Sequence, residues 1–384
     1  MAEGLVKEQC DVTVITSDAL TARYWYDPIF GKKIKEKKST INGVKVYRLS
    51  CNQPLSSFYF ILVRIFPFFL TKSLLSKLSI AYQGPILTGL KHTLQENYFD
   101  VIHSSPFPYY LTKQVAHVVS QLDHKPTVIV TPFFHSSVMD FSNKNLQEVC
   151  DKTDYIHVVS NAEKKEIQKK FIVQSKKLVT IPLFLNLQKT ISSNKNIKKI
   201  KRFKKNYELE GKKVVFFVGN KGYMKGAITL LQVIDKLHKK DPSYVLIAIG
   251  NNLPEWNDQK KKIAQDALLD LGYVSEEEKH LLYEVCDILC MPSKSESFGL
   301  TYLEAWQYKK PVIGCDIPSS KELIQGNNAG LLVPFDSKTA LENAILELFN
   351  NPKERRKYGE NGYKALKKKY TEEQFFSQFI KLLE

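Results

Sequence analysis

Short runs of β-branched and aromatic residues alternate with longer amphipathic stretches, and this alternation limits the fold more than any other feature. The runs that predict strands lie at 11–16, 44–49, 99–104, 127–131, 155–160 and 178–182, and then at 214–219, 244–250, 286–292 and 311–315. Stretches with helical spacing lie between them, for example at 161–171, 226–239, 275–285 and 337–349. Because the strand runs are apolar without strict alternation, they fit parallel strands buried on both faces. The pattern predicts the α/β class.

A lysine-rich stretch divides the strand runs into two series. Segment 186–212 has few residues suited to a core, which indicates a basic linker with a surface helix. We therefore expect an N-terminal Rossmann-like domain over 1–185 and a C-terminal one over 213–366, followed by a last helix over 367–384 that packs back toward the first domain. Two doubly wound domains of this kind face each other across a cleft, and their ligands bind beyond the carboxyl ends of the strands.

The charge of the chain indicates an anionic partner. Its 384 residues contain 56 Lys+Arg against 40 Asp+Glu, a formal charge of +16. Such a balance suits a nucleic acid, an anionic membrane face or phosphorylated substrates, without choosing among them. The basic patches 32–38 and 195–205 can bind phosphates or simply face solvent. The apolar run 58–70 is too short to span a bilayer, and it can be either a core helix or a membrane-facing one.

The compartment follows from the cysteines and the start of the chain. The six cysteines are scattered, and no CxxC pair offers a zinc or redox site, so a reducing compartment is favoured. The first ten residues lack the apolar region of a signal peptide. We expect a cytoplasmic protein that can lie peripherally on the inner face of a membrane.

The stretch PSKSESFGLTYLEAWQYKKPVIG (292–314) carries the most chemical information. Residues 297–300 read as a loop that enters a helix, so the backbone N–H groups of 298–301 form an anion site suited to a diphosphate. Glu296 lies on the loop ahead of this site, and Glu304 lies about one turn into the helix. Carboxylates accept charge-assisted hydrogen bonds from vicinal hydroxyls. The arrangement suits a sugar nucleotide, with its sugar, diphosphate and ribose in a row.

ESFGLTYLEA followed by PVIG resembles the E-x7-E signature of the family 4 retaining glycosyltransferases, also called glycosyl transferases group 1, which have the GT-B fold. VVFFVGNKGYMKGAITLL (214–231), YVLIAIG, LGYVSEEEKHLLYEVCDILCMPS and KELIQGNNAGLLVPF follow in the order and spacing of that family. In the first half, TPFFHSS and YIHVVSNAEKKEI resemble two further landmarks. The resemblance covers about 11–384. It implies two Rossmann-like domains that face each other across a cleft.

The resemblance also implies roles for individual residues. Glu304 would bind the ribose hydroxyls of the donor, Glu296 the donor sugar, and Lys225 the diphosphate leaving group. His135 would lie close to the transferring sugar. The remaining donor contacts would be made by Tyr273 and Val274 beside the nucleobase and by Phe298, Gly299, Leu300 and Thr301 along the sugar and phosphates. Each charged residue also has a structural alternative, as a helix-capping or loop acid, a surface lysine or a structural histidine.

Three departures from the family pattern stand out. Asn220 occupies the position where the family usually has Arg, so we expect Asn220 and Lys221 to contact the donor phosphates, at a cost in bidentate binding. Ser319 and Ser320 replace the glycines that commonly precede the ELI segment, which predicts different contacts near the donor sugar. The opening strand and its glycine-rich loop have no counterpart before 11–16, which predicts a weakened first domain and suggests a truncated or mis-started reading frame.

The resemblance implies a retaining transferase that moves a hexose-type sugar from a UDP- or GDP-sugar to a saccharide or lipid-linked acceptor. The chain contains no DxD, and we expect no cofactor and no metal. We find no candidate nucleophile for a double displacement, so front-face substitution is the favoured hypothesis. Two alternatives stay open: a nucleotide-sugar epimerase of the same fold, and an inactive basic protein that binds membranes or nucleic acid. The chain lacks an evident aromatic-basic motif, so nucleic acid is the less expected partner.

Overall fold

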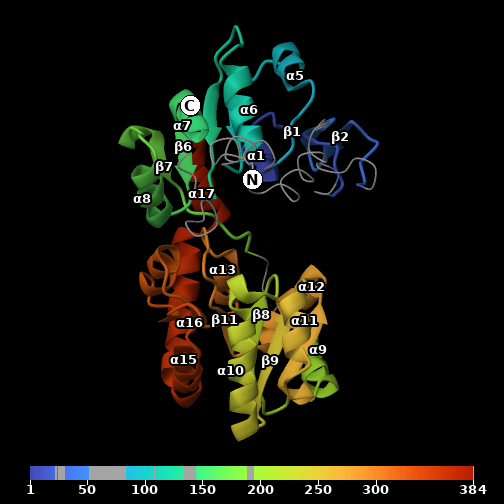
Figure 1. Cartoon of the computed structure of the whole chain (residues 1–384), viewed down its shortest axis with the longest axis vertical. Helices are drawn as coiled ribbons and strands as arrows, with labels where there is room; N and C mark the ends of the chain where they lie inside the picture. Colours follow the sequence, from blue (N-terminus) through green and yellow to red (C-terminus); the bar gives the residue numbers. More distant parts are fainter. Residues whose placement is uncertain are drawn as a thin grey trace, which may run out of the picture.

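The computed structural model describes residues 1–21, 24, 31–51, 84–107, 109–133, 144–187 and 194–383. They form two lobes, one above the other in Figure 1. The upper lobe holds the first half of the chain together with the last helix, and the lower lobe holds the remainder. Both lobes are built on mainly parallel sheets flanked by helices, which confirms the α/β class. The apolar run 58–70 lies outside the described residues.

The strands of the first domain form two separate sheets. The first contains β1 (Thr13–Ser17), β2 (Lys38–Ile41) and β3 (Val44–Leu49) in the order β1-β3-β2, with β2 antiparallel to β3. The second contains β4 (Val101–Ser104), β5 (Thr127–Val130), β6 (Tyr155–Val158) and β7 (Leu178–Thr180), all parallel and in chain order. The helices of this domain are α1 (Ala2–Lys7), α5 (Leu90–Glu96), α6 (Tyr110–Val119), α7 (Lys144–Lys152), α8 (Asn161–Lys170) and η1 (Ser175–Lys177).

A cavity of about 150 Å³ separates the two sheets of the first domain. Thr13 and Ile15 of β1 line one side, and Val101–Ser104 of β4 lines the other. Both β1 and β4 are end strands, so each leaves one edge of its ladder without a neighbouring strand among the described residues. No strand precedes β1 in the described chain, which begins with the short helix α1. The cavity therefore lies between two strand edges that have no neighbouring strand among the described residues.

The second domain is built on one six-stranded parallel sheet. Its strands β8 (Lys213–Val218), β9 (Tyr244–Ile249), β10 (Leu268–Gly272), β11 (Ile288–Met291), β12 (Val312–Cys315) and β13 (Gly330–Val333) are ordered β10-β9-β8-β11-β12-β13. Strands β9, β11 and β12 are fully buried, as the unbroken apolar runs predict. The order of the strands reverses between β8 and β11. Ligands of doubly wound sheets bind beyond the carboxyl ends of the strands at this reversal.

The helices of the second domain cover this sheet. They are α9 (Asn194–Asn206), α10 (Ala227–Lys240), α11 (Pro254–Lys260), α12 (Glu276–Val285), α13 (Leu300–Gln307), α14 (Pro318–Ser320), α15 (Lys338–Asn350) and α16 (Pro352–Lys369), with the short turns η2 (Tyr223–Lys225), η3 (Gln265–Ala267) and η4 (Lys321–Gln325). The lysine-rich segment expected as a linker contains α9, which contacts α12. Ile200 and Phe203 of α9 pack against the core of the second domain. The basic helix is therefore part of that domain.

The chain ends in the domain where it began. Helix α17 (Glu372–Phe379), followed by η5 (Ile380–Leu382), lies in the first lobe (Figure 1). Its buried residues Phe375, Phe376 and Phe379 pack against Ile129 and Ile181 of the first domain. No helix in the described parts of the chain is both long enough and apolar enough to cross a bilayer.

Candidate functional site

Two loops meet where the strand order of the second domain reverses. The loop after β8 runs through η2 to Gly226, and the loop after β11 begins at Pro292. The Lys294 amide donates to the Met224 carbonyl at 2.9 Å. Gly226 has φ +71°, and a Cβ there would lie 2.4 Å from the Pro292 carbonyl oxygen. Only glycine allows this close approach, which brings the two loops together.

Lys225 and Glu296 form an ion pair between these loops. The Lys225 ammonium lies 2.5 Å from Glu296 Oε1, and the two side chains are 34% and 15% exposed. We call the loop after β11 that carries Glu296 the acidic loop. The Ser319 hydroxyl donates to the Glu296 carbonyl at 2.7 Å, so this serine fixes the backbone of the acidic loop. The sequence predicted altered contacts at Ser319 without identifying this one. The pair leaves a cation and a carboxylate side by side at the carboxyl end of the sheet.

Helix α13 begins directly after this pair. Gly299 precedes it with φ +100°, and the Tyr302 hydroxyl donates to the Met291 carbonyl at 3.0 Å, which anchors the first turn on β11. Phe298 is buried, Thr301 is half-buried and Leu300 is 43% exposed. The first N–H groups of an α-helix lack intrahelical acceptors and carry its positive dipole end. The sequence-predicted residues Phe298–Thr301 therefore surround a helix N-terminus beside Glu296 and Lys225.

Glu304 lies on the next turn of α13, as the sequence predicted. One of its oxygens, Oε1, accepts from the Lys279 ammonium at 3.0 Å, and the other, Oε2, accepts from the Tyr283 hydroxyl at 2.6 Å. Both partners come from α12. Sequence reasoning missed Lys279 and Tyr283 because their spacing on α12 is also that of an ordinary amphipathic helix.

Lys221, which the sequence predicted beside the donor phosphates, has its side chain in the interior of the domain. Its side chain is fully buried, and its ammonium lies 2.5 Å from Asp270 Oδ1. Asp270 also accepts from Trp256 Nε1 at 3.0 Å and from Lys260 at 2.9 Å. Burial alone would raise the pKa of Asp270, but these three donors hold it at about 2. The ammonium of Lys221 therefore serves the interior of the domain. Its neighbour Asn220 is exposed at the end of β8.

The carboxyl ends of β8, β9 and β10 carry Gly219, Gly250 and Gly272, which leave a surface of backbone atoms that we call the backbone floor. The Gly250 amide donates to the Gly272 carbonyl at 2.7 Å, and a Cβ on Gly250 would lie 2.2 Å from the Gly219 carbonyl oxygen. Tyr273 follows this floor with its side chain 81% exposed, whereas Val274 packs against the core. The structure thus places Tyr273 at the surface beside the carboxyl end of the sheet.

The first domain covers the acidic loop. A cavity of about 60 Å³ is lined by Ala162 and Glu166 of α8, by residues 294–297 and by residues 317–319. Glu322 joins the domains beside it, because its carboxylate accepts from the amides of Asn161 at 3.0 Å and Ala162 at 2.8 Å. Glu296 therefore faces a space between the domains. His135 lies outside the described residues.

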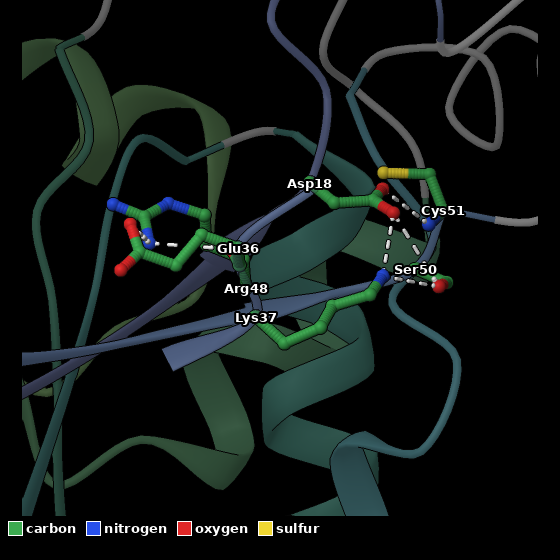
Figure 2. Close-up of polar contacts among 6 residues, drawn as sticks. All are labelled: Asp18, Glu36, Lys37, Arg48, Ser50 and Cys51. Atoms are coloured by element: carbon green, nitrogen blue, oxygen red, sulfur yellow. Dashed lines mark hydrogen bonds and ion pairs between the residues drawn. The ribbon is translucent and has the colours of Figure 1, made fainter. Parts of the chain in front are cut away.

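A second polar cluster lies at the carboxyl ends of β1 and β3 (Figure 2). Asp18 is buried and accepts from the Lys37 ammonium at 2.7 Å. Lys37 also donates to the Ser50 hydroxyl at 2.9 Å, and the Cys51 amide lies 3.4 Å from Asp18. Arg48 lies 3.8 Å from Glu36 on the neighbouring segment. These contacts fasten the strand ends of the first sheet to one another.

The described residues contain no group of three or more His, Cys, Asp or Glu side chains placed to hold a metal ion. Among the described residues, Lys225 and Glu296 pair at the carboxyl end of the second sheet, and Glu304 lies on the next helix turn with Lys279 as its partner. This set can bind hydroxyl groups and phosphates through hydrogen bonds and charge.

Known proteins share this domain and this fold. The model of the family "Glycosyl transferases group 1" matches residues 198–365. The O-antigen chain mannosyltransferase C of Escherichia coli is 28% identical over 181 residues, which are 46% of this chain and 47% of that protein. The chain thus spans about half the length of this relative.

Two solved structures resemble the whole chain. The sucrose-phosphate synthase of Thermosynechococcus elongatus superposes with a TM-score of 0.72 at 18% identity, covering 99% of this chain and 90% of its own. HepE of Anabaena, solved with UDP-glucose, gives a TM-score of 0.69 at 16% identity, covering 89% and 86%. The chain therefore has the GT-B fold, and its residues 198–365 are a domain of the glycosyl transferases group 1 family.

Proposed function

We propose that this chain is a retaining glycosyltransferase that moves a hexose-type sugar from a UDP- or GDP-sugar to a saccharide or lipid-linked acceptor, without a metal ion. The observation that carries the proposal is the Lys225–Glu296 pair at the N-terminus of α13, with Glu304 one turn further along the helix. Glu296 then matches the sugar of a nucleotide-sugar, the Lys225 ammonium and the helix N-terminus match its diphosphate, and Glu304 matches its ribose.

Each part of the donor has a matching group. The first amides of α13 and the Lys225 ammonium neutralise the diphosphate. Glu296 accepts hydrogen bonds from the sugar hydroxyls, and Glu304 accepts them from the ribose hydroxyls. The backbone floor after β10 and Tyr273 receive the nucleobase. HepE was solved with UDP-glucose, which supports a donor of this class.

The reaction breaks the bond between the anomeric carbon and the donor phosphate oxygen. The sugar develops positive charge and the departing diphosphate negative charge, which Lys225 and the helix amides stabilise. The acceptor oxygen attacks the anomeric carbon from the face that the diphosphate leaves. A phosphate oxygen takes the acceptor proton, so the new bond keeps the anomeric configuration. Trapping a covalent glycosyl-enzyme in a competent variant would contradict this route.

The acceptor enters from the first domain, across the cavity between α8 and the acidic loop. The E. coli relative is named for O-antigen chain synthesis, which supports a saccharide or lipid-linked acceptor. The charge of +16 suits an anionic membrane surface that carries such an acceptor. Equal recovery of the protein with and without anionic liposomes in a flotation assay would contradict membrane association.

Thermal shift with UDP, GDP, ADP and their sugar conjugates tests the donor site. A ligand at a hundred times its dissociation constant stabilises the fold by about 2.7 kcal/mol. We expect one nucleotide series to stabilise the protein and Glu304→Gln to abolish the effect. Glu360→Gln is the matched control, because Glu360 pairs with Lys309 on the surface of α16. No shift with any nucleotide in the folded protein would contradict the proposal.

Product analysis separates a transferase from its alternatives. Incubation of the stabilising donor with saccharide acceptors should give a glycoside with the donor's anomeric configuration, observed by NMR. An epimerase would convert the donor sugar without an acceptor. A binding protein would leave the donor intact and bind nucleic acid or membranes with steep salt dependence.

A further inference from the structure

Glu304 receives two hydrogen bonds from one neighbouring helix. The Lys279 ammonium binds Oε1 at 3.0 Å, and the Tyr283 hydroxyl binds Oε2 at 2.6 Å. These two donors lie four residues apart on α12, so they emerge from the same face of that helix. Each oxygen of the carboxylate therefore has its own donor, and the two hydrogen bonds together restrict the rotation of the carboxylate.

The ring of Tyr283 is held in place on two sides. Its side chain is fully buried, and the ring stacks on that of Tyr308 at a centroid distance of 5.9 Å and an interplanar angle of 2°. Phe216 of β8 meets it edge-on at 5.1 Å. Burial raises the pKa of the Tyr283 hydroxyl well above its ordinary value, and the charge of Glu304 raises it further. The hydroxyl thus stays protonated and acts as a donor.

Lys279 is held between two carboxylates. Its ammonium lies 2.9 Å from Glu276 and 3.0 Å from Glu304, with its side chain only 16% exposed. Burial disfavours the charged form, but the two carboxylates outweigh burial and raise the pKa of Lys279. Lys279 therefore remains a cation beside Glu304.

A carboxylate offers about four lone-pair sites, two on each oxygen. Lys279 and Tyr283 occupy one site on each oxygen of Glu304. One site on each oxygen then remains for a ligand, which gives the carboxylate two further acceptor sites. Two adjacent hydroxyl groups on one ring match such a pair of acceptors, whereas a single hydroxyl uses only one of them.

We propose that Lys279 and Tyr283 are positioning residues that orient Glu304 toward both ribose hydroxyls of the donor, and that α12 thereby sets the selectivity for ribose over deoxyribose. This inference rests on the proposed function. It adds that the selectivity depends on the donors behind Glu304 and not on the carboxylate alone, because a freely rotating carboxylate would lose rotamer entropy on binding the diol.

Calorimetric titration with matched nucleotides tests the inference. The probes are the nucleoside diphosphate that stabilises the protein and its 2′-deoxy analogue. We expect the wild type to prefer the ribonucleotide at least about tenfold, a fold-change typical of one lost charge-assisted hydrogen bond. Tyr283→Phe should weaken ribonucleotide binding about tenfold and leave deoxynucleotide binding within about twofold. The preference between the two sugars then collapses.

Two further variants make the comparison specific. Tyr308→Phe is the matched control, because it keeps the ring against Tyr283 and removes a hydroxyl that contacts His280 at 2.7 Å instead of Glu304. It should keep the preference of the wild type. Lys279→Gln removes the cation and should reduce the preference, and Lys279→Arg should restore it. The lysine variants also serve if Tyr283→Phe unfolds the protein, which circular dichroism would show.

The outcomes separate this inference from the proposed function. Equal weakening of both nucleotides by Tyr283→Phe and Lys279→Gln would overturn the inference, because it would show a purely structural role. Equal affinity of the wild type for both nucleotides would overturn it too. If the wild type binds no nucleotide, the proposed function fails and this inference fails with it. If the wild type discriminates but the variants behave like it, the inference alone fails.

Discussion

Two lysines of the same loop have opposite surroundings. Lys225 is partly exposed and faces Glu296, whereas Lys221 is fully buried and faces Asp270. The sequence places both after β8 beside glycines, where either could meet a phosphate. The structure separates them because Asp270, which also accepts a hydrogen bond from Trp256 Nε1, is a partly buried acceptor for Lys221. Lysine is suited to both places, so residue type alone cannot decide between them.

Replacing Lys225 by methionine should therefore reduce activity, whereas replacing Lys221 by methionine should reduce stability. Lys225→Met should reduce kcat/KM about 100-fold, because a phosphate-neutralising cation acts in the transition state. Its free energy of unfolding should change by less than about 1 kcal/mol, as for a partly exposed ion pair. Lys221→Met should lower the free energy of unfolding by about 3 kcal/mol, because it leaves Asp270 with a lost partner. Urea denaturation and steady-state kinetics measure both quantities.

The reverse pattern would contradict the assignment. A stable Lys221→Met protein with lost activity would place Lys221 at the donor. An active Lys225→Met protein would remove Lys225 from the site. Lys309→Met is the control for a surface lysine, since Lys309 pairs with Glu360 away from the loops.

At the scale of elements, three strands of the first domain share a buried polar chain. The Thr131 hydroxyl lies 2.7 Å from His103 Nε2 and 3.0 Å from His157 Nδ1. His157 Nε2 lies 2.7 Å from the Ile181 carbonyl, so it donates there and its Nδ1 accepts from Thr131. Phe379 of α17 packs edge-on against both imidazoles. These hydrogen bonds thus link β4, the end of β5 and β6 beneath α17.

This network predicts acid sensitivity of the first domain. Burial, together with the charge of His157, lowers the pKa of His103 to about 3. Burial also lowers the pKa of His157. An unfolded histidine titrates near 6.5. Below that pH the unfolded state binds protons that the native state excludes, so stability falls as the pH falls toward the native pKa values. Each histidine should contribute up to about 1.4 kcal/mol per pH unit.

Urea denaturation between pH 7 and 5 tests this prediction, with unfolding followed for the first domain. His103→Gln should reduce the slope by about one proton. The same slope in the wild type and the variant would show that His103 is protonated in the native state or does not govern the transition.

The strands that the sequence missed share a physical reason. Segment 38–41 forms β2, but three of its four residues are exposed, so it carries no apolar signal. Strand β10 contains the partly buried Asp270, and β13 is only four residues long. The long apolar runs were predicted to within a few residues, for example 44–49 and 244–250 against Val44–Leu49 and Tyr244–Ile249. A strand that is buried on both faces has an apolar run that predicts it from the sequence, whereas a strand at the edge of a sheet lacks such a run.

The sequence predicted residues of the candidate site, but it did not predict the side chains from other elements that contact them. The positions of Glu296 and Glu304 around the helix start follow from local spacing, whereas Lys225 was predicted from the resemblance to the family. The structure brings Glu296 and Lys225 together. Lys279, Tyr283 and the contact of Ser319 with Glu296 depend on how separate elements pack. Nothing in the spacing of α12 tells which of its faces meets α13. Tertiary partners of this kind are set by the assembled sheet.

At the scale of the whole molecule, Glu322 of the second domain caps a helix of the first. Its carboxylate accepts from the Asn161 and Ala162 amides at the N-terminus of α8 and from the Asn161 side chain. The helix dipole adds to the attraction. This contact lies beside the cavity that Glu296 faces. The distance between the two domains at the proposed site is thus set in part by one carboxylate.

Glu322→Ala should loosen the contact between the domains. The loss of its hydrogen bonds should cost the closed arrangement about 1.5–3 kcal/mol. We expect a larger radius of gyration in small-angle scattering and a higher KM for the acceptor, with each domain still folded. Glu360→Ala, on the surface of α16, is the control. An unchanged radius of gyration and KM would show that the remaining contacts hold the domains without Glu322.

The return of α17 to the first domain has a mechanical consequence. The chain crosses between the lobes twice, and the crossings are joined, since the Leu185 amide donates to the Tyr370 carbonyl at 3.0 Å and Leu185 pairs with Thr371. Two tethers fastened side by side define a single axis. We expect the lobes to open and close about this paired crossing, with less freedom to rotate against each other than a single linker would leave. The same faces of the two lobes should then meet again after each opening.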